Sequence, residues 1–315
     1  MQLLAVNFHY FRENKTGRGI FPLTLKEFEN QIERISKFYD FVSENDIIEN
    51  LKNGKKISKN SCLLTFDDGL KEQMSVANLL LKKGIPGMFY VSSEPIKNNT
   101  VLDVHKLHFI RSILSEKELY NILCKEHELD TYSFNQTLLK NQYRYDNDLG
   151  RKIKYFMNFV LSDKDRKQTI NYLFKELVSS EEEFAKDLYM SFSDLKKLSK
   201  NSMLGTHAKN HIPLGSLSEQ EIEHEIKDSI SDLNAIIGEN KIRSISYPYG
   251  GITAVTDKVA NIAEKSGLDF GLTMWRGIND LNDLDNKFLL KRIDTNDAPG
   301  GKLNSSEYIL KEIIN

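Results

Sequence analysis

The alternation of predicted strands and helices between residues 60 and 91 constrains the fold of this 315-residue chain more than any other feature. The apolar run at 62–66 predicts a buried strand, and apolar residues at helical spacing follow it as far as Gly84. The segment IPGMFYV at 85–91 predicts the next strand. A strand, a helix and a strand in this order form a βαβ unit, in which the two strands run parallel. We therefore expect a parallel sheet.

The same alternation occurs on both sides of this unit. One predicted helix begins with a capping box at Thr24 and Glu27, and another begins with a capping box at Ser218 and Glu221. A series of β/α repeats favours an α/β barrel, whose site lies at the carboxyl ends of its strands. The other strands are expected at 2–8, 202–207, 242–250, 268–275 and 287–294.

The pattern changes between residues 100 and 200. This segment is charged, and its apolar residues follow a mostly helical spacing with few strand signals. No internal repeat or low-complexity tract is visible in the sequence. We interpret residues 1–315 as a single domain that carries a mostly helical insertion at about 100–200.

Composition and charge exclude several classes of function. A formal net charge of −2 leaves no basic excess to neutralise phosphates, so nucleic acid is not expected as a partner. Cys62 and Cys124 form no framework of spaced pairs, as expected in a reducing compartment. The N-terminal segment MQLLAVNFHYFRENK lacks the features of a signal peptide, and no apolar stretch approaches the ~20 residues that span a bilayer. We therefore expect a cytoplasmic protein with no membrane span.

Two carboxylates, Asp67 and Asp68, directly follow the strand predicted at 62–66. Like charges this close repel each other, and a metal ion is the compensating charge that we expect. His207 and His211 are the matching ligands, because four-residue spacing on a helical turn places two imidazoles on one side. Two histidines and one carboxylate form a common open catalytic metal set. The second carboxylate can then accept the proton of a water molecule whose pKa the ion lowers.

Each of these motifs has a plainer interpretation when it is taken alone. An Asp pair at a strand end also fits a loop cap or an ion pair. Two histidines four residues apart also fit a polar surface. Their joint position at predicted strand ends of one β/α series favours a functional site over both of these interpretations.

In chain order, the segments TFDDG (65–69), HAKNH (207–211) and SYPYG (246–250) resemble the motifs of the polysaccharide deacetylases of carbohydrate esterase family four. The resemblance covers roughly residues 1–100 and 190–295 and leaves the insertion out. It implies a distorted (β/α) barrel of the NodB-type homology domain, with one divalent metal ion that is usually zinc. It also implies hydrolysis of an N-acetyl group on a sugar.

Matched position by position, the resemblance implies a role for each motif residue. Asp67 would be the catalytic base. The backbone N–H of Tyr249 would help to hold the oxyanion of the tetrahedral intermediate, and Pro248 would shape that turn beside the substrate. The implied metal ligands, which suit zinc with cobalt or nickel as replacements, are Asp68, His207 and His211.

Three positions depart from the usual motifs of this family. Ala208 follows the first metal histidine where Ser or Thr is usual, and Ser246 stands where the third motif carries an arginine. No histidine follows His224, so the general acid of the fifth motif is absent. The proton for the leaving amine must then come from Asp67 or from His9, which ends the first predicted strand. We favour His9.

Two further residues near predicted strand ends complete the candidate site. Arg292 would replace the absent arginine of the third motif, orient Asp67 and keep it ionised by its opposite charge. Trp275 would stack on a sugar ring of the substrate, or else belong to the core or the rim of the barrel.

The function expected from the sequence is that of a metal-dependent hydrolase, a carbohydrate N-deacetylase. Its substrate would be an N-acylated sugar in a glycan or in a nucleotide-linked or lipid-linked glycan precursor. One alternative is a deacylase of another acyl group, such as formyl, and another is a non-catalytic glycan-binding protein on the same fold. The intact Asp pair and histidines favour an enzyme. No oligomeric state is predicted.

Overall fold

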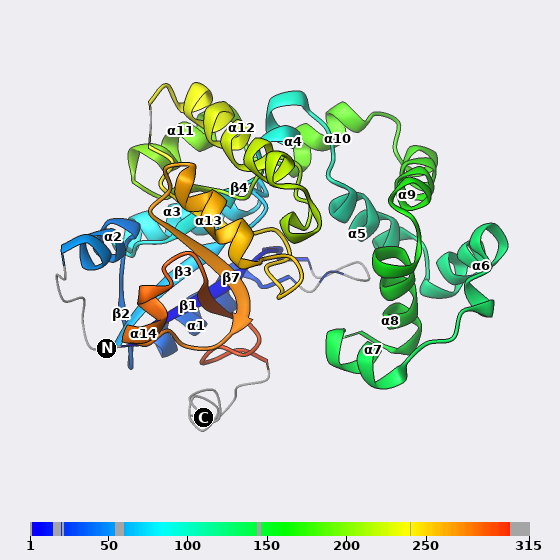
Figure 1. Cartoon of the computed structure of the whole chain (residues 1–315), viewed down its shortest axis with the longest axis horizontal. Coiled ribbons are helices and arrows are strands. Elements are labelled where there is room, and N and C mark those ends of the chain that lie inside the picture. The colour runs from blue at the N-terminus through cyan, green and yellow to red at the C-terminus, as the bar shows by residue number, and fades with distance from the viewer. Residues whose placement is uncertain are drawn as a thin grey trace. The chain divides into compact units, whose positions relative to one another are not determined.

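The structure, a computed structural model, describes residues 2–14, 20, 22–53, 60–143, 146–239 and 241–302. Their contacts divide the chain into two compact units, whose helices and strands are labelled in Figure 1. Unit 1 contains the described residues of 1–13, 22–100 and 185–315, and unit 2 contains those of 14–21 and 101–184.

Unit 1 is built on a closed barrel of parallel strands. The seven strands of the barrel are β1 (Gln2–Phe8), β3 (Asn60–Phe66), β4 (Met88–Val91), β5 (Leu204–Thr206), β6 (Ser244–Ser246), β7 (Phe270–Arg276) and β8 (Leu290–Asp294). Neighbours follow the order β1-β8-β7-β6-β5-β4-β3, and parallel pairing of β1 with β3 closes the ring. The short strand β2 (Asp40–Phe41) adds to the start of β3. This architecture confirms the α/β barrel predicted from the repeats.

Both faces of the barrel strands are covered. In β1 and β3 every residue after the first is buried, which explains why both strands read as nearly continuous apolar runs. Asn7 and Thr65 are polar exceptions, and the register of the two strands pairs them directly. The residues two positions further on along the chain are His9 and Asp67.

Two helices of unit 1 begin at the predicted capping boxes. The helices of this unit are α1 (Leu25–Ile35), α2 (Glu44–Asn53), α3 (Gln73–Lys83), α4 (Ser93–Asn98), α11 (Phe192–Lys200), α12 (Glu219–Ile237), α13 (Asp257–Lys265), α14 (Leu281–Asp285) and the short 3₁₀ turn η3 (Leu214–Ser216). Both capping boxes form, at Thr24 before α1 and at Ser218 before α12. Helix α3 ends at Gly84, whose φ of +66° is left-handed. Helices α11, α12 and α13 pack on the outside of the sheet (Figure 1).

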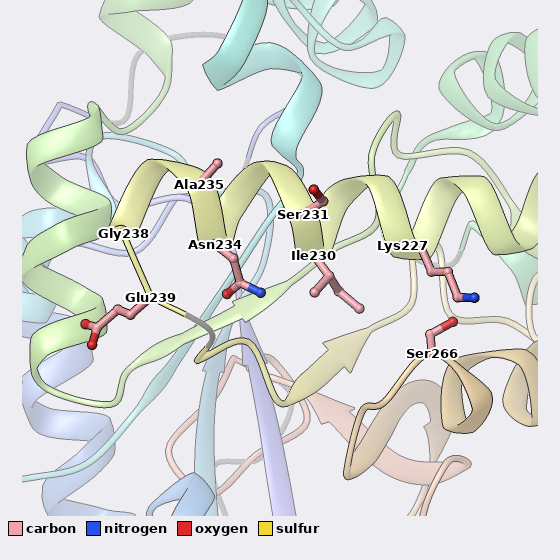
Figure 2. A pocket seen from close by; sticks show the side chains of 8 residues that line it. All are labelled: Lys227, Ile230, Ser231, Asn234, Ala235, Gly238, Glu239 and Ser266. Carbon is pink, nitrogen blue, oxygen red and sulfur yellow. The ribbon is translucent and has the colours of Figure 1, made fainter.

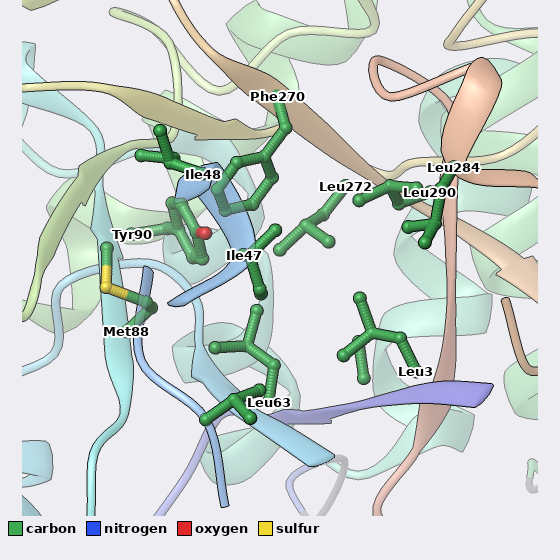
Figure 3. Close-up of a cluster of buried hydrophobic side chains, with 12 residues drawn as sticks. Leu3, Ile47, Ile48, Leu63, Met88, Tyr90, Phe270, Leu272, Leu284 and Leu290 are labelled. Carbon is green, nitrogen blue, oxygen red and sulfur yellow. The ribbon is translucent and has the colours of Figure 1, made fainter. Parts of the chain in front are cut away.

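Helix α2 packs into the apolar core at the amino-terminal end of the barrel. Ile47 and Ile48 lie among buried side chains from the barrel strands, including Leu3, Leu63 and Leu272 (Figure 3). Apolar side chains fill most of this part of the barrel interior.

One carboxylate is buried beside this core. Glu44, in the first turn of α2, is 4% exposed and accepts a hydrogen bond from Ser244 Oγ in β6. Tyr90 OH lies 3.1 Å from the same Ser244 oxygen. Burial raises the pKa of Glu44 to about 7, although the Ser244 hydrogen bond and the charge of Arg243 act in the opposite direction.

A groove of about 590 Å³ runs along α12 on the outside of the barrel. Its lining includes Lys227, Ile230 and Asn234 of α12 and Ser266 at the end of α13 (Figure 2). Helix residues and helix ends form this groove, so it is separate from the carboxyl ends of the strands.

Unit 2 consists of helices and connecting loops in its described residues. They are α5 (Asp103–Ile113), α6 (Glu116–His127), α7 (Gln136–Gln142), α8 (Asp148–Tyr155), α9 (Asp163–Leu177), the short turns η1 (Leu129–Thr131) and η2 (Phe156–Val160), and α10 (Glu181–Leu188), which runs across the boundary between the units. Arg111 is buried there and pairs with Asp146 and Glu116. The interpretation of the chain as one domain with an insertion at about 100–200 stays a prediction. Throughout the described residues, no helix is both long and apolar enough to cross a membrane.

Candidate active site

The two carboxylates lie where β3 ends, at the carboxyl-terminal edge of the barrel. Asp67 continues the pairing with β1, because its N–H donates to Phe8 O at 3.1 Å. The chain then turns sharply, since Asp68 and Gly69 have φ values of +80° and +67°. A Cβ atom at Gly69 would lie 2.9 Å from Val91 Cγ1, so glycine is required there both for conformation and for space. This turn separates the two carboxylates, which are both buried.

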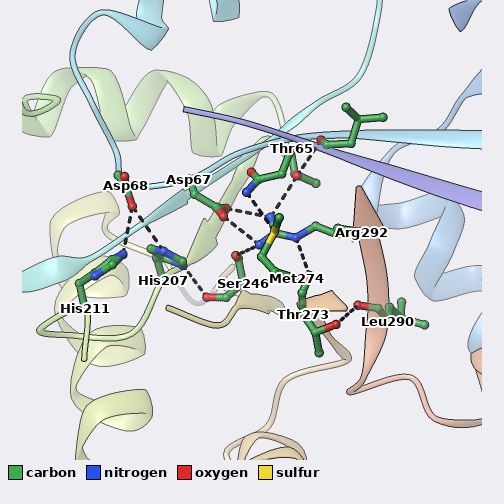
Figure 4. Close-up of polar contacts among 12 residues, drawn as sticks. Thr65, Asp67, Asp68, His207, His211, Ser246, Thr273, Met274, Leu290 and Arg292 are labelled. Carbon is green, nitrogen blue, oxygen red and sulfur yellow. Dashed lines mark hydrogen bonds and ion pairs between the residues drawn. The ribbon is translucent and has the colours of Figure 1, made fainter. Parts of the chain in front are cut away.

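His207 directly follows β5, and hydrogen bonds fix both its backbone and its ring. Its backbone N–H donates to Val91 O at 2.9 Å, and its ring Nδ1 lies 2.6 Å from Ser246 O. Because a carbonyl oxygen only accepts, Nδ1 carries the proton and donates it. The lone pair is then on Nε2, which faces Asp68 (Figure 4). A backbone carbonyl that orients the second ring nitrogen is typical of a metal-ligating histidine.

The segment between the histidines is a loop, so the helical turn that we predicted there is wrong. Ala208 and His211 have φ values of +57° and +52°, which no helix accommodates. The two imidazoles nevertheless lie side by side as expected, because the ring centroids of His207 and His211 are 4.9 Å apart. The loop brings the two rings together by backbone reversal and not by helical periodicity.

Asp68, His207 and His211 form a ligand cluster in which all three ligand atoms lie within 4.8 Å of one another. Asp68 Oδ1 lies 3.4 Å from His207 Nε2 and 3.3 Å from His211 Nε2. Two ligand atoms that are each about 2.0–2.1 Å from a tetrahedral zinc ion are about 3.3–3.4 Å apart. The same separations exceed the usual length of an N–H···O hydrogen bond. The donor set and its spacing therefore fit one divalent ion.

Asp67 is paired with Arg292, which reaches it from β8 (Figure 4). The guanidinium group is fully buried and donates to both carboxylate oxygens, from Nη1 at 3.1 Å and from Nη2 at 2.8 Å. Arg292 also donates to Ser246 Oγ, Thr65 Oγ1 and Thr273 O. Arg292 thus occupies the space beside Ser246, the position where the motif arginine is absent.

The pKa of Asp67 lies below its ordinary value. Burial raises this pKa, but Arg292, through its charge and hydrogen bonds, and the nearby His207 and His9 lower it by more in total. Asp67 is therefore an ionised carboxylate that can accept a proton, and its geometry is fixed by a bidentate partner.

His9 lies one residue beyond the end of β1, next to Asp67 on the neighbouring strand. The register ends with Phe8 opposite Phe66, so His9 and Asp67 are the residues that follow this last pair, and His9 lies close enough to help lower the pKa of Asp67. Gln73 joins the two residues, because its Nε2 donates to His9 O at 2.8 Å and to Asp67 O at 2.6 Å. His9 is partly exposed, which suits a group that meets a substrate.

Tyr249 lies in the turn after β6, with a left-handed φ of +60°. The turn is tight, since Gly250 N donates to Pro248 O at 2.7 Å. A Cβ atom at Gly250 would lie 2.5 Å from Met274 N, so this turn also requires glycine. Tyr249 is 44% exposed, and its ring centroid lies 5.0 Å from that of His211. The Tyr249 ring therefore borders the ligand cluster.

Trp275 lies near the carboxyl end of β7, and its backbone N–H donates to Thr273 Oγ1 at 3.1 Å. It is partly buried, and its proposed contact with a sugar stays a prediction. Three residues that hold the site from outside were not predicted from the sequence: Gln73, Glu225 and Ser229. The signal that could have found the last two is their position on the apolar face of α12, where polar side chains are unusual.

Fold and site together define an α/β barrel protein with an Asp-His-His cluster beside a buried carboxylate–arginine pair. The sequence profile of one family, Polysaccharide deacetylase, matches residues 54–271, which is more than half of the chain. The chain therefore belongs to the polysaccharide deacetylase family, which confirms the resemblance of its motifs. Membership supports a hydrolase that removes acetyl groups from a carbohydrate. A comparison with curated protein sequences gives no significant match.

Several solved deacetylase structures have a similar fold. The Streptococcus pyogenes deacetylase PplD, solved in complex with acetate, has a TM-score of 0.59 and 17% identity over 96% of this chain and 97% of that chain. IcaB from Ammonifex degensii has a TM-score of 0.55 and 14% identity over 93% and 91% of the two chains. The BpsB deacetylase domain from Bordetella bronchiseptica has a TM-score of 0.54 and 16% identity over 93% and 95%. At these identities the similarity establishes the fold.

Proposed function

We propose that this chain is a metal-dependent N-deacetylase that hydrolyses the acetamido group of an amino sugar. Its substrate is a sugar in a glycan, or in a nucleotide-linked or lipid-linked glycan precursor. The observation that supports the proposal is that two adjacent carboxylates at one strand end have different partners. Asp68 faces two imidazole nitrogens at 3.3–3.4 Å, whereas Asp67 is held by Arg292.

The proposed metal is one divalent ion held by Asp68, His207 and His211. Two imidazoles and a carboxylate suit zinc, and cobalt or nickel could replace it. When bound, the ion supplies Lewis-acid chemistry, because it polarises the acetyl carbonyl and lowers the pKa of water.

Asp67 is the proposed base that takes the proton of the attacking water. Arg292 keeps this carboxylate ionised and fixes its direction, which a general base needs at the moment of attack. The backbone N–H of Tyr249 is proposed to donate to the oxyanion as negative charge develops on the former carbonyl oxygen. Pro248 and Trp275 are proposed to border the sugar.

Expulsion of the amine requires a proton on the leaving nitrogen. His9 is the proposed donor, because the strand register sets it beside Asp67. Asp67 itself is the alternative donor, since it holds the proton that it took from water. In both cases the sugar leaves as a free amine and the acyl group leaves as acetate.

The activity is tested by incubation of zinc-loaded protein with a panel of N-acylated sugars. The panel contains small acetamido sugars, a nucleotide-linked sugar, short chitin oligomers and long chitin, each with an N-formyl counterpart where one can be made. Released acetate and formate are quantified separately. We expect acetate from small or precursor-linked sugars. Formate as the main product would favour a different deacylase, and binding of the sugars without any release would favour a glycan-binding protein.

Two variants test the division of roles between the carboxylates. Asp67→Asn should keep the metal and lose at least about 10²-fold in turnover, because an amide does not accept the proton. His207→Ala should lower metal content and turnover together. Metal content per chain is measured by mass spectrometry. If Asp67→Asn emptied the metal site, the assignment of the base would be wrong.

A further inference from the structure

The loop that carries the two histidines is tied to a buried carboxylate on α12. Glu225 lies on the apolar face of this helix, between Ile222 and Ile226, and is 7% exposed. Burial of a carboxylate is costly unless hydrogen bonds replace its hydration. The hydrogen-bond partners of Glu225 therefore indicate its role.

Both oxygens of Glu225 accept hydrogen bonds from one residue. The backbone N–H of Asn210 donates to Oε2 at 2.9 Å, and Asn210 Nδ2 donates to Oε1 at 2.5 Å. Asn210 directly precedes His211, so this bidentate contact fixes the peptide that leads into the second histidine. Hydrogen bonds to a charged acceptor are roughly twice as strong as neutral ones.

The loop needs such fixing because its backbone is strained. Ala208 and His211 both have left-handed φ values, of +57° and +52°. A non-glycine residue in this region is strained and persists only where its surroundings impose it. Ala208 has no polar side chain with which to hold the loop from within. Helix α12 holds it from outside, since Ser229 Oγ also donates to Ala208 O at 3.0 Å.

We infer that Glu225 is a positioning residue for the metal ligands: it fixes Asn210 so that His211 Nε2 stands beside Asp68 before an ion binds. A loop without this contact would have to be ordered when the ion binds, and the ordering would weaken affinity. The inference rests on the proposed function only in taking Asp68, His207 and His211 as ligands. Partners of this kind typically change metal affinity by about 10–100-fold.

The test measures the dissociation constant for zinc in Glu225→Gln, by competition with a chromophoric chelator. Glutamine keeps the size of the side chain but replaces one accepting oxygen with an NH₂ group, which cannot accept from Asn210. We expect zinc to bind about 10–100-fold more weakly. We also expect the visible spectrum of the cobalt form to change, because the placement of one imidazole changes.

Asp228→Asn is the matched control. Asp228 lies on the same helix and pairs with Lys209 of the same loop at 3.0 Å, but its side chain is 47% exposed. A surface ion pair of this kind contributes little. Zinc affinity in this variant should therefore stay within about twofold of the wild-type value.

A purely structural role for Glu225 predicts a different result. In that case Glu225→Gln would lower the melting temperature of the metal-free protein and leave zinc affinity and the cobalt spectrum unchanged, which would overturn the inference. Should this variant fail to fold, Asn210→Ala removes only the side-chain hydrogen bond, and unchanged zinc affinity in it would overturn the inference equally.

The assay uses the metal ion alone, so it separates this inference from the proposed activity. A wild-type protein that binds zinc through these ligands but releases no acetate would contradict the deacetylase and leave the role of Glu225 standing. A wild-type protein that binds no zinc would overturn both.

Discussion

At the scale of single residues, the site depends on how the surroundings divide two adjacent carboxylates. Asp67 accepts two hydrogen bonds from Arg292, whereas Asp68 faces two imidazoles. Left-handed backbone at Asp68 makes this division, because it turns the second side chain away from the first. Four of the seven described non-glycine residues with positive φ belong to this site: Asp68, Ala208, His211 and Tyr249. Such concentrated strain is typical of functional sites.

His9 is the residue whose role the first prediction tests. We expect His9→Ala to cut turnover by at least about 10²-fold while metal content stays unchanged, because a positioned acid is worth roughly 10²–10⁴-fold. The measurement is acetate release under saturating substrate, with metal content determined on the same sample. His224→Ala is the control, since His224 lies on α12 and not at a strand end. Near-normal turnover in His9→Ala would transfer the proton donation to Asp67.

We expect Arg292 to set the pH range in which Asp67, the proposed base, works. Burial raises the pKa of Asp67, and Arg292 is the first of the charges that lower it. In Arg292→Met the raising effect of burial is no longer balanced, so the carboxylate is protonated at higher pH. The acid limb of kcat/KM should therefore move to higher pH by about 1–3 units. An acid limb at the wild-type position would show that Arg292 does not keep Asp67 ionised.

The contact between Arg292 and Asp67 shows what sequence could and could not provide at this scale. The absence of the motif arginine at Ser246 suggested that another cation must stand there, and Arg292 was the candidate. The sequence does not reveal that Arg292 donates hydrogen bonds to both Ser246 and Asp67, because the closed barrel brings these residues together. Glu225 was not predicted, because its partner Asn210 is set by loop geometry and not by a spacing that a sequence displays.

At the scale of elements, long periodic segments were predictable and short ones were not. The strand expected at 2–8 is β1, because four consecutive apolar residues form its centre. Strand β2 was missed, since two residues cannot display alternation. Helix α2 was missed although Ser43 and Asp46 have capping-box spacing at its start and hydrogen-bond to each other's backbone N–H. The histidine segment was wrongly predicted as a helical turn, because contacts with α12 and left-handed residues override its spacing.

Helix α2 gives a prediction at this scale, through Glu44. Its pKa is about 7 in the folded protein, against an ordinary value of 4.5, so the folded state binds this proton more tightly than the unfolded state does. The contribution to stability is complete below pH 4.5 and is lost as pH rises through 7. A shift of this size corresponds to about 3 kcal/mol in the free energy of unfolding.

Glu44→Gln removes the titrating group and keeps a neutral side chain of the same size. In denaturant unfolding, we expect the free energy of unfolding of the wild-type protein to fall between about pH 5 and pH 7. In Glu44→Gln this fall should be absent. Glu49→Gln, on the same helix, serves as the control. An equal decrease in Glu44→Gln and the wild-type protein would mean that another group causes it.

At the scale of the whole molecule, the site exists only when the barrel is closed. Asp67 comes from β3, Arg292 from β8 and His9 from the end of β1, and β1 pairs with both of the other strands. These strands are far apart in the chain, so their pairing has a large entropic cost of loop closure, which precedes the favourable contacts between them. The proposed base, its arginine and the candidate acid therefore come together only through non-local strand pairing.

All three proposed metal ligands belong to unit 1, which leads to a final prediction about unit 2. Arg111 is buried in unit 2, where it pairs with Asp146 at 3.0 Å and with Glu116 at 3.1 Å. Removal of one partner from a buried ion pair costs about 3–5 kcal/mol, because the other charge stays buried without compensation. In Arg111→Met the loss of stability should be smaller than this, since Lys154 still pairs with Asp146 at 2.7 Å. We expect about 10²-fold lower hydrogen-exchange protection in α5, α6 and α8.

Zinc affinity in the same variant should stay within about twofold of the wild-type value, because local opening of a separate compact unit leaves the ligand cluster intact. Lys167→Gln is the control, since Lys167 and its partner Asp163 are 49% and 64% exposed and such a surface pair contributes little. If zinc affinity fell together with protection in unit 2, the two units would unfold as one cooperative structure. The chain would then behave as the single domain with a helical insertion that its sequence predicts.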